Sequence, residues 1–509
     1  MNRPLNRRMI TLSIMLATIM QTLDTTIANV ALPHMQGTLS ASQDQIAWVL
    51  TAYIVASAIA TPLTGWMVDR FGQKKIFLVS VIGFTIASAL CGLSNSLAEI
   101  VAARLLQGVF GAALVPMSQM VLMDINPPEK QGSAMAVWGM GVMVGPILGP
   151  TLGGWLTDSY DWRWVFFINI PVGVVATYGI LRYIRPTPAT RRMLFDSFGF
   201  VSLSLSVGSL QLLMDRGQQN DWFSSTETWV EVTVLTVAFT YFVAHTALTR
   251  ADRSFLDYRL LKNSNYLSGL VFIFIVGLVL YATRALTPTM LENLMGYPVA
   301  TAGLVTAPSG IGTMFAMRIA GRVIGRVDLR LTLLVGFLVS ALALWQMTGY
   351  TLVLSESDIV WPGVIQGIGT GLVFVPLSAA TFATLSPAMR AQGTAIYSLV
   401  RNVGSSIGIS LVQTVLERNT IAVHASMVEK ITHGNPAWNN PAVASAFDLS
   451  NPSSAAALDS LVNQQSQMIA YVNDFRLMLY LTLAVIPLLL FLRPPARNAA
   501  PVDAHAVMD

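Results

Sequence analysis

Asp24 is the residue of this sequence best placed to do chemistry, because it is the one carboxylate among 26 that lies deep within a long apolar segment. At a rise of 1.5 Å per residue, Asp24 is roughly 12 Å from the far end of a helix over residues 10–32. Arg104 enters the segment 97–122 from that same side and lies roughly 10 Å deep. A charge near the centre of a bilayer costs at least about 2.5–3.5 kcal/mol. Two interpretations are open: an ion pair that locks two helices together, or a carboxylate that takes and releases a proton as Arg104 withdraws and returns.

Further polar residues in the apolar segments are candidates for hydrogen bonds near this pair and for the lining of a substrate cavity. Four can supply hydrogen bonds, although the sequence does not fix which way they face: Asn29, Tyr53, Gln107 and Gln119. Arg401 lies about eight residues into the segment 393–417 with no acidic residue at its depth, so it holds a carbonyl group or an anionic substrate, or extends to the membrane surface. We expect Arg284 to form a structural pair with Glu292 near the outer surface.

The composition shows what must position these residues. Of 509 residues, 54% are hydrophobic and only 11% are charged, against about 25% charged in an average soluble domain. This excludes soluble, fibrous, disordered and nucleic-acid-binding proteins, and predicts a polytopic membrane protein. The single cysteine, Cys91, excludes a disulfide framework, the five histidines have no metal-ligand spacing, and no nucleotide-binding loop is present. We therefore expect no cofactor and no catalysis.

Fourteen apolar segments predict an all-α membrane protein with fourteen spans. The predicted spans are 10–32, 46–68, 76–93, 97–122, 134–156, 164–182, 195–214, 229–248, 265–288, 299–321, 331–351, 359–382, 393–417 and 474–492. Because the first apolar run continues without a small-residue cleavage site, we interpret it as an uncleaved helix.

The basic residues predict the orientation. With the N-terminus in the cytoplasm, 21 of the 30 Lys and Arg residues fall in inside segments and four in outside segments. This bias places both termini in the cytoplasm. One predicted outside loop, 418–473, is much longer than the others, and it is either a tolerated insertion or a docking surface.

The chain repeats itself at an offset of about 256 to 260 residues, since the stretches 106–118 and 365–378 are alike, as are 65–75 and 321–330. We therefore predict a six-helix bundle at 1–190, an inserted two-helix segment at 191–262, a second bundle at 263–498 and a tail at 499–509. Parallel six-helix repeats are typical of transporters, with the substrate path between the halves.

Two motifs suggest moving parts. The turn at 65–75 contains Asp69, Arg70 and Gly72, and its counterpart in the second half, 321–330, contains Arg326. These two turns are either a latch that holds a gate closed or two ordinary inside loops. The segment 139–154 has glycines four apart and two prolines in its interior: Gly145, Pro146, Gly149 and Pro150. Close helix packing would explain the glycines, and adding the prolines favours a bendable, tightly sealed helix at a moving interface.

Taken in order, these stretches resemble the major facilitator superfamily, and within it the fourteen-helix drug:proton antiporters of the EmrB/QacA type. The stretches that resemble family signatures are 23–33, 65–75, 104–108, 141–154, 162–173 and 401–408. The second-half turn departs from the pattern, because Gly325 stands where the first half has Asp69. The resemblance implies that Arg104 takes part in proton transfer, and the depth of Asp24 and its closeness to Arg104 lead us to expect that Asp24 is the coupling carboxylate.

The long loop points to the EmrB branch in particular. The resemblance then implies a bacterial inner-membrane exporter of hydrophobic or amphipathic drugs, working with a periplasmic adaptor of the EmrA type and an outer-membrane channel of the TolC type. A secondary transporter of a metabolite or siderophore, and a membrane sensor built on a transporter fold, are the alternatives.

Overall fold

The computed structural model describes residues 6–186, 195–249, 254–324, 326–431, 447 and 451–491. Within these ranges the regular elements are helices, joined by turns and loops, with an isolated bridge between Ile324 and Val327. The all-α prediction is therefore confirmed. Gly325 and the predicted tail 499–509 lie outside the described residues.

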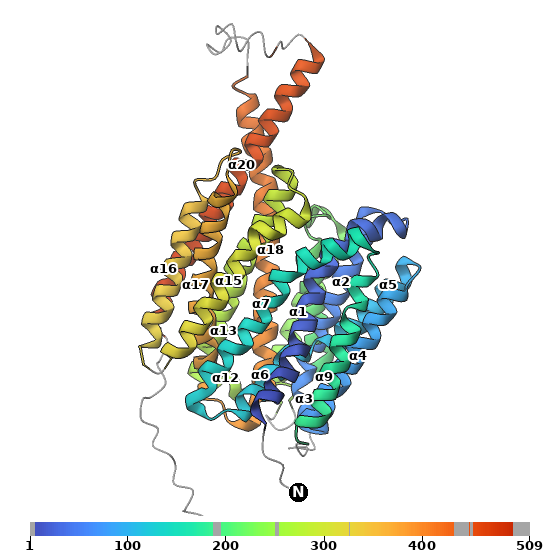
Figure 1. Ribbon diagram of the computed structural model, residues 1–509, viewed down its shortest axis with the longest axis vertical. Helices are drawn as coiled ribbons and strands as arrows, with labels where there is room; N and C mark the ends of the chain where they lie inside the picture. The colour runs from blue at the N-terminus through green and yellow to red at the C-terminus, as the bar shows by residue number, and fades with distance from the viewer. Residues whose placement is uncertain are drawn as a thin grey trace, which may run out of the picture.

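The helices form a long bundle (Figure 1). In the first half they are α1 (Arg7–Thr38), α2 (Gln43–Ala60), α3 (Leu63–Phe71), α4 (Gln73–Leu93), α5 (Leu97–Gly111), α6 (Leu114–Ile125), α7 (Pro128–Ser159), α8 (Trp164–Phe167) and α9 (Asn169–Tyr183). An additional pair follows, α10 (Ser197–Arg216) and α11 (Thr226–Leu248). The second half contains α12 (Arg259–Lys262), α13 (Ser264–Val276), α14 (Ala282–Thr289), α15 (Val299–Val323), α16 (Leu329–Met347), α17 (Glu356–Ala383), α18 (Arg390–Val428) and α20 (Pro452–Val485).

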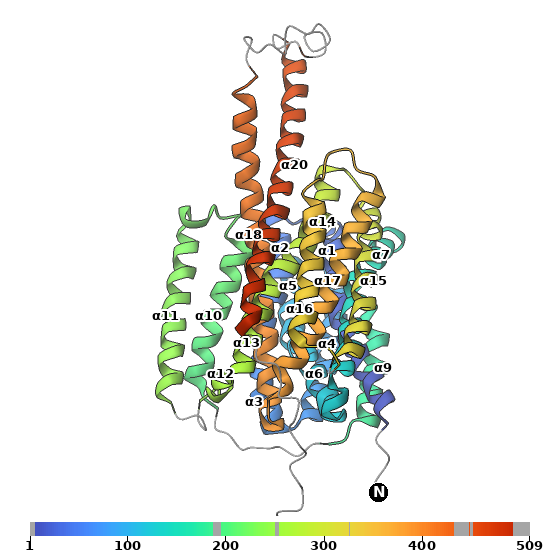
Figure 2. The ribbon, with the colours of Figure 1, turned by 90° about the vertical axis from the view of Figure 1, so that its left-hand side faces the viewer.

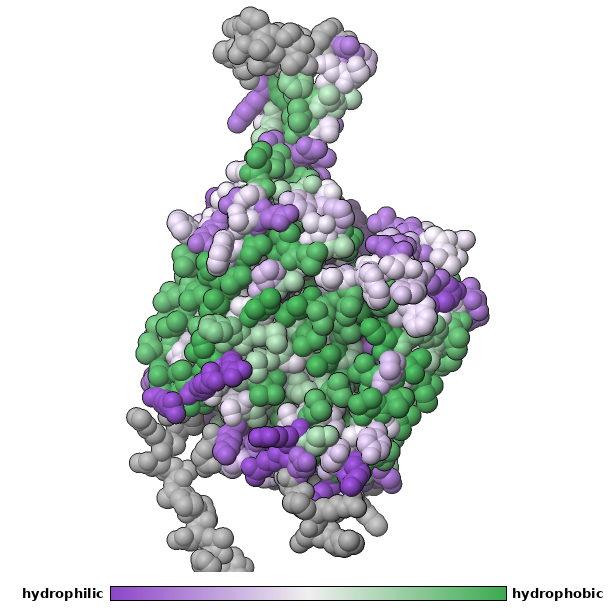
Figure 3. Space-filling view, in the orientation of Figure 1, coloured by the Kyte–Doolittle hydropathy of each residue, from purple (hydrophilic) through white to green (hydrophobic). Residues whose placement is uncertain are grey.

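Among the described residues, thirteen helical stretches, some made of two or more consecutive helices, are each long and apolar enough to cross a membrane, and α2 with α3, bent by 53°, makes a fourteenth. On the face shown in Figure 3, apolar side chains gather in a broad belt across the middle of the molecule, and polar side chains lie at both ends. Such a belt is the surface that a bilayer requires, because lipid cannot hydrate polar groups. The chain is a multi-pass membrane protein. We call the end of the bundle that carries the N-terminus the N-terminal end, and the opposite end the hairpin end.

The pair α10 and α11 stands to one side of the bundle (Figure 2). Of the two, α10 packs against α2 of the first half and α18 of the second, whereas α11 packs mainly on α10. Many large apolar side chains of α11 are exposed, among them Val237 and Phe239. They face the surroundings of the bundle, as expected for a helix in contact with lipid.

Helix α7 packs closely on two different helices, α1 and α15. A methyl group added at Gly145 would lie 2.5 Å from the backbone of Thr22 in α1, and one at Gly149 would lie 2.1 Å from the Thr26 hydroxyl. Pro150 instead meets Gly303 of α15, where an added methyl would lie 2.6 Å away. Helix α7 is thus in close contact with α1 in its own half and with α15 in the other half.

The predicted loop 418–473 is partly wrong. Helix α18 continues to Val428 and α20 begins at Pro452, so much of this segment is a pair of helices that projects beyond the bundle (Figures 1 and 2). His424 and Asp459 join the two helices with a 3.1 Å contact. These stretches are alanine-rich and polar, and they therefore favour helix without the apolar run by which a span is recognised. We call this projection, 418–431 and 451–473, the hairpin.

We expect Gly145→Ala to lower the stability of the protein by about 1–3 kcal/mol, because the added methyl group overlaps the α1 backbone. Gly37→Ala is the matched control, since a methyl group there meets nothing within 4 Å. The measurement is the melting temperature of each purified variant in detergent. Equal melting temperatures for the two variants would contradict the close packing of α7 on α1.

Candidate functional site

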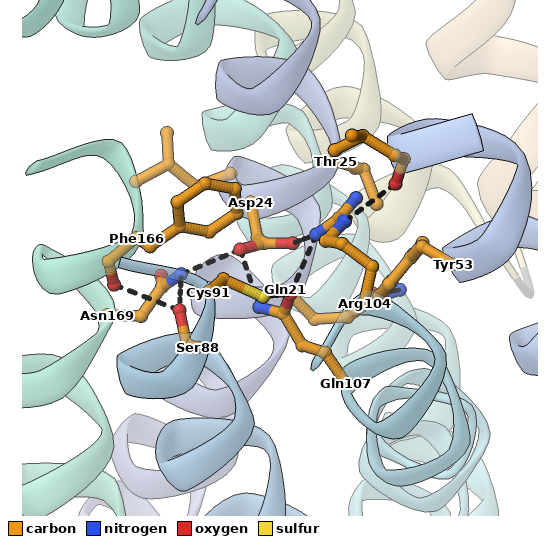
Figure 4. A network of polar contacts seen from close by, with 12 residues as sticks. Gln21, Asp24, Thr25, Tyr53, Ser88, Cys91, Arg104, Gln107, Phe166 and Asn169 are labelled. Carbon is orange, nitrogen blue, oxygen red and sulfur yellow. Dashed lines mark hydrogen bonds and ion pairs between the residues drawn. The ribbon is translucent and has the colours of Figure 1, made fainter. Parts of the chain in front are cut away.

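Asp24 and Arg104 form an ion pair, a contact that both interpretations of the sequence include. The Arg104 Nη1 group donates to Asp24 Oδ2 at 2.7 Å (Figure 4), and the side chains are at most 1% exposed. On the other carboxylate oxygen, Asp24 Oδ1 accepts from Gln107 Nε2 at 2.7 Å and from Asn169 Nδ2 at 2.8 Å. Three donors from α5 and α9 thus surround one carboxylate of α1, an arrangement that satisfies its ionised form.

Arg104 is held by more than its carboxylate partner. Its Nη1 group also donates to Gln107 Oε1 at 2.7 Å, and its Nε group donates to the Val49 carbonyl of α2 at 3.0 Å. The guanidinium carbon lies 4.3 Å from the ring centre of Tyr53 and 5.7 Å from that of Phe166. These contacts with neutral groups keep the guanidinium partly satisfied when the carboxylate is neutral.

Asn169 and Ser88 are site residues that the sequence analysis did not select. Asn169 Nδ2 also lies 3.0 Å from Ser88 Oγ, which in turn donates to the Phe166 carbonyl at 2.9 Å (Figure 4). The Cys91 thiol lies 3.5 Å from Gln107 Oε1. Asn169 lies within the stretch 162–173, which resembles a family signature. Nothing else in the sequence marks a neutral amide in an apolar segment as a site residue.

The four predicted hydrogen-bonding residues fall in different places. Gln107 is in the network, and the Tyr53 hydroxyl accepts from Gln21 Nε2 at 3.1 Å beside it. Gln119 is fully buried in α6, with no described partner for either amide atom. Asn29 is exposed and does not join the contacts described around Asp24.

The two arginines of the second half are also separated. Arg401 is 7% exposed in α18, and its Nη2 group lies 3.3 Å from Asn402 Oδ1. Arg284 does not bond Glu292, so that prediction is wrong. Its guanidinium contacts Met143 Sδ of α7 at 3.2 Å and Thr313 Oγ1 of α15 at 2.9 Å. Glu292 is eight residues further along, about 12 Å on the helical rise, and this distance separates the two side chains.

The two halves touch at the N-terminal end. Arg390 at the start of α18 pairs with Asp124 at the end of α6, at 2.9 Å. A methyl group at Gly65 of α3 would lie 2.9 Å from the Gln392 backbone of α18. The structure therefore has this end closed by α3 and α6 against α18.

The residues predicted to form a latch lie at this closed end. Gly72 separates α3 from α4 with a φ of +88°, a conformation that glycine adopts without strain. The Arg70 guanidinium carbon lies 5.5 Å from the ring centre of Trp66, and Asp69 is partly buried in the last turn of α3. Arg326 is exposed between α15 and α16.

Known proteins are similar to this chain in sequence and in fold. The sequence profile of the Major Facilitator Superfamily matches residues 14–409. The chain is 34% identical to the multidrug export protein EmrB of Escherichia coli strain K12, over 95% of both chains. It is 33% identical to the fatty acid resistance protein FarB of Neisseria gonorrhoeae, over 96% of both. Among solved structures, the human organic anion transporter MFSD10 aligns with a TM-score of 0.58 at 14% identity, over 94% of this chain and all of that one, which shows a shared fold alone.

We expect Asn169→Ala to lower the free energy of unfolding by about 1.5–3 kcal/mol, because it removes a hydrogen bond to a buried ionised group. Asn29→Ala makes the same chemical change at an exposed position of α1 and should have little effect. Thermal unfolding of both purified variants measures the difference. A larger loss in the Asn29 variant would show that the assigned network is wrong.

Proposed function

The chain belongs to the major facilitator superfamily and to its EmrB-type transporters, and on this premise we propose that it exports hydrophobic or amphipathic toxic compounds in exchange for protons. Asp24 is the proton carrier in this proposal, and Arg104 is the charge that opposes its protonation. The family consists of transporters, so the work of the site is the transfer of a proton and a change of shape.

One observation carries the proposal. Asp24 lies on the stretch of α1 between Thr22 and Thr26, which pack on Gly145 and Gly149 of α7. Helix α7 in turn packs along α15 of the other half. A change in the charge of Asp24 therefore acts on the helix that connects the two halves.

The cycle follows from the charges. With Asp24 ionised and paired, the two halves are in contact at the N-terminal end. A proton arriving from the hairpin end neutralises Asp24 and removes its attraction to Arg104, which keeps the Val49 carbonyl and Gln107 as partners. We propose that α1 and α7 then shift together, so that the N-terminal end opens to take up the next substrate.

The contacts at the N-terminal end form the gate of this cycle. Arg390 and Asp124 have to separate for the end to open, and so do Gly65 and Gln392. We assign Asp69, Arg70 and Gly72 to the first-half side of the gate and Arg326 to the weaker second-half side. The two bundles, 1–190 and 263–498, are the moving bodies.

The location and the partners are part of the proposal. The basic N-terminal end faces the cytoplasm of a bacterial cell, and the hairpin then stands on the periplasmic side of the inner membrane. There it is placed to meet a periplasmic adaptor of the EmrA type, joined to an outer-membrane channel of the TolC type. Ile421 is 64% exposed on the hairpin, and Leu461 on the other hairpin helix is 45% exposed. They offer apolar contacts to such a partner.

We expect Asp24→Asn to abolish drug movement driven by a pH gradient, because the amide cannot carry the proton. The assay follows a lipophilic fluorescent drug and internal pH in liposomes that contain the purified protein. Asp44→Asn, which changes an exposed aspartate in the first turn of α2, is the control and should transport normally. Unimpaired antiport by Asp24→Asn would refute the assignment, and drug binding that no gradient affects, in the wild type, would favour a sensor.

We expect Ile421→Asp to weaken co-purification of the adaptor and to lower drug resistance of whole cells by at least about tenfold, while antiport in liposomes stays normal. The reason is that a charge placed in an apolar contact has to be desolvated on binding. Val353→Asp is the matched control, since Val353 is 91% exposed in the loop between α16 and α17, off the hairpin. The same loss in both variants would show that the hairpin is not the specific docking surface.

A further inference from the structure

Arg284 is a partly buried arginine for which the described residues provide no acidic partner. It lies in the ninth span, Ser264–Leu294, ten residues from the end of that span and thus about 15 Å deep. The acceptors described for its guanidinium are a thioether sulfur, Met143 Sδ, and a hydroxyl, Thr313 Oγ1. Both are neutral, and sulfur is a weak acceptor. Among the described residues, no carboxylate forms an ion pair with Arg284 within 4 Å.

A charge at this depth is costly, and such residues in transporters mark substrate and ion pathways. The contrast with Arg104 is clear. Arg104 has the full negative charge of Asp24 at 2.7 Å, whereas the contacts of Arg284 among the described residues are with neutral atoms. The described part of the chain therefore leaves the positive charge of Arg284 without a matching negative charge.

Arg284 lies between the two halves of the bundle. Its two contacts come from different halves, Met143 from α7 of the first and Thr313 from α15 of the second. In parallel-repeat transporters the substrate site lies between the halves near the middle of the membrane. The ninth span is also irregular here, because π-helical turns at 277–281 and 290–294 flank α14. Such turns occur frequently at functional sites.

Methionines surround this part of α7. Besides Met143, Met15 of α1 packs at Gly141 and Met317 of α15 packs at Gly139. Methionine side chains are flexible and polarisable, and surfaces rich in them accept apolar groups of different shapes. An unmatched guanidinium beside an adaptable apolar surface suits a molecule with one acidic head and an apolar body.

We propose that Arg284 is the binding subsite for the acidic head group, carboxylate or sulfonate, of amphiphilic substrates, which makes the transporter prefer anionic over cationic amphiphiles. The inference rests on the proposed export function and names the substrate class of the site between the halves. The guanidinium offers a planar, two-pronged set of donors, and this geometry matches a carboxylate or sulfonate. Thr313 and Met143 hold the guanidinium in place between the halves.

The test compares two probes with the same tail and permanent opposite charges, decanesulfonate and decyltrimethylammonium. Binding is measured to the full chain in phosphatidylcholine nanodiscs, with empty nanodiscs as background, for the wild type and for Arg284→Gln, Arg284→Lys and Arg216→Gln. Arg216 is the matched control, because it is an arginine of α10 paired with Glu227, away from α7 and α15. We expect Arg284→Gln to weaken decanesulfonate binding by about tenfold or more, with binding of the cation unchanged or tighter. Arg284→Lys should retain part of the affinity, and Arg216→Gln should match the wild type.

Other results would overturn the inference. These are a wild type that does not bind decanesulfonate, an Arg284→Gln variant that binds it normally, and an equal loss for both probes. Nanodiscs that contain phosphatidylglycerol separate a substrate from a lipid. If that anionic lipid displaces decanesulfonate, a lipid head group is the natural occupant and the substrate assignment fails.

Export of both probes from cells is measured in parallel. If decanesulfonate binds through Arg284 but neither probe is exported, the subsite stands and the proposed function fails. If the cation is exported and Arg284→Gln leaves decanesulfonate binding unaffected, the proposed function stands and the subsite fails.

Discussion

The ion pair of Asp24 and Arg104 is the interaction on which the rest of the site depends. Each charge alone would be very costly in an apolar interior, and the pair exists because further donors and acceptors complete its bonds. Gln107 and Asn169 satisfy the carboxylate, and the Val49 carbonyl and the Tyr53 ring satisfy the guanidinium. The network therefore fixes three helices around α1, and any change in its charge changes how those helices fit together.

Close packing carries that change across the molecule. Tightly packed helices do not deform continuously, so a shift of α1 has to be taken up by a neighbour. Gly145 and Gly149 leave no free space between α1 and α7, and Pro150 with Gly303 leaves none between α7 and α15. The glycines and prolines of α7 thus make two kinds of close contact, with α1 in the same half and with α15 in the other half.

The sequence predicted the parts of this arrangement that are rare in a membrane. Carboxylates and arginines deep in spans are few, so Asp24 and Arg104 were evident, and the glycine spacing of α7 was equally distinctive. Asn169 was not, because a neutral amide is tolerated at many depths. Asn29 does not join the described contacts around Asp24: five residues at about 100° each place it roughly 140° around the helix from Asp24, and it is exposed.

Two further differences from the sequence analysis also have physical causes. The Glu292 partner for Arg284 was inferred from closeness along the chain, whereas α7 and α15 reach Arg284 from distant parts of the sequence. A search for apolar runs predicts a loop at the hairpin, because polar helices lack the apolar run of a membrane span. This helix has a mechanical consequence, since α18 runs unbroken through 39 residues, about 58 Å, from the Arg390–Asp124 contact to the hairpin. A rigid helix of that length acts as a lever: a tilt of about 10° at its base displaces its tip by about 10 Å, so in the proposed cycle each opening of the N-terminal end is expected to move the hairpin by that distance.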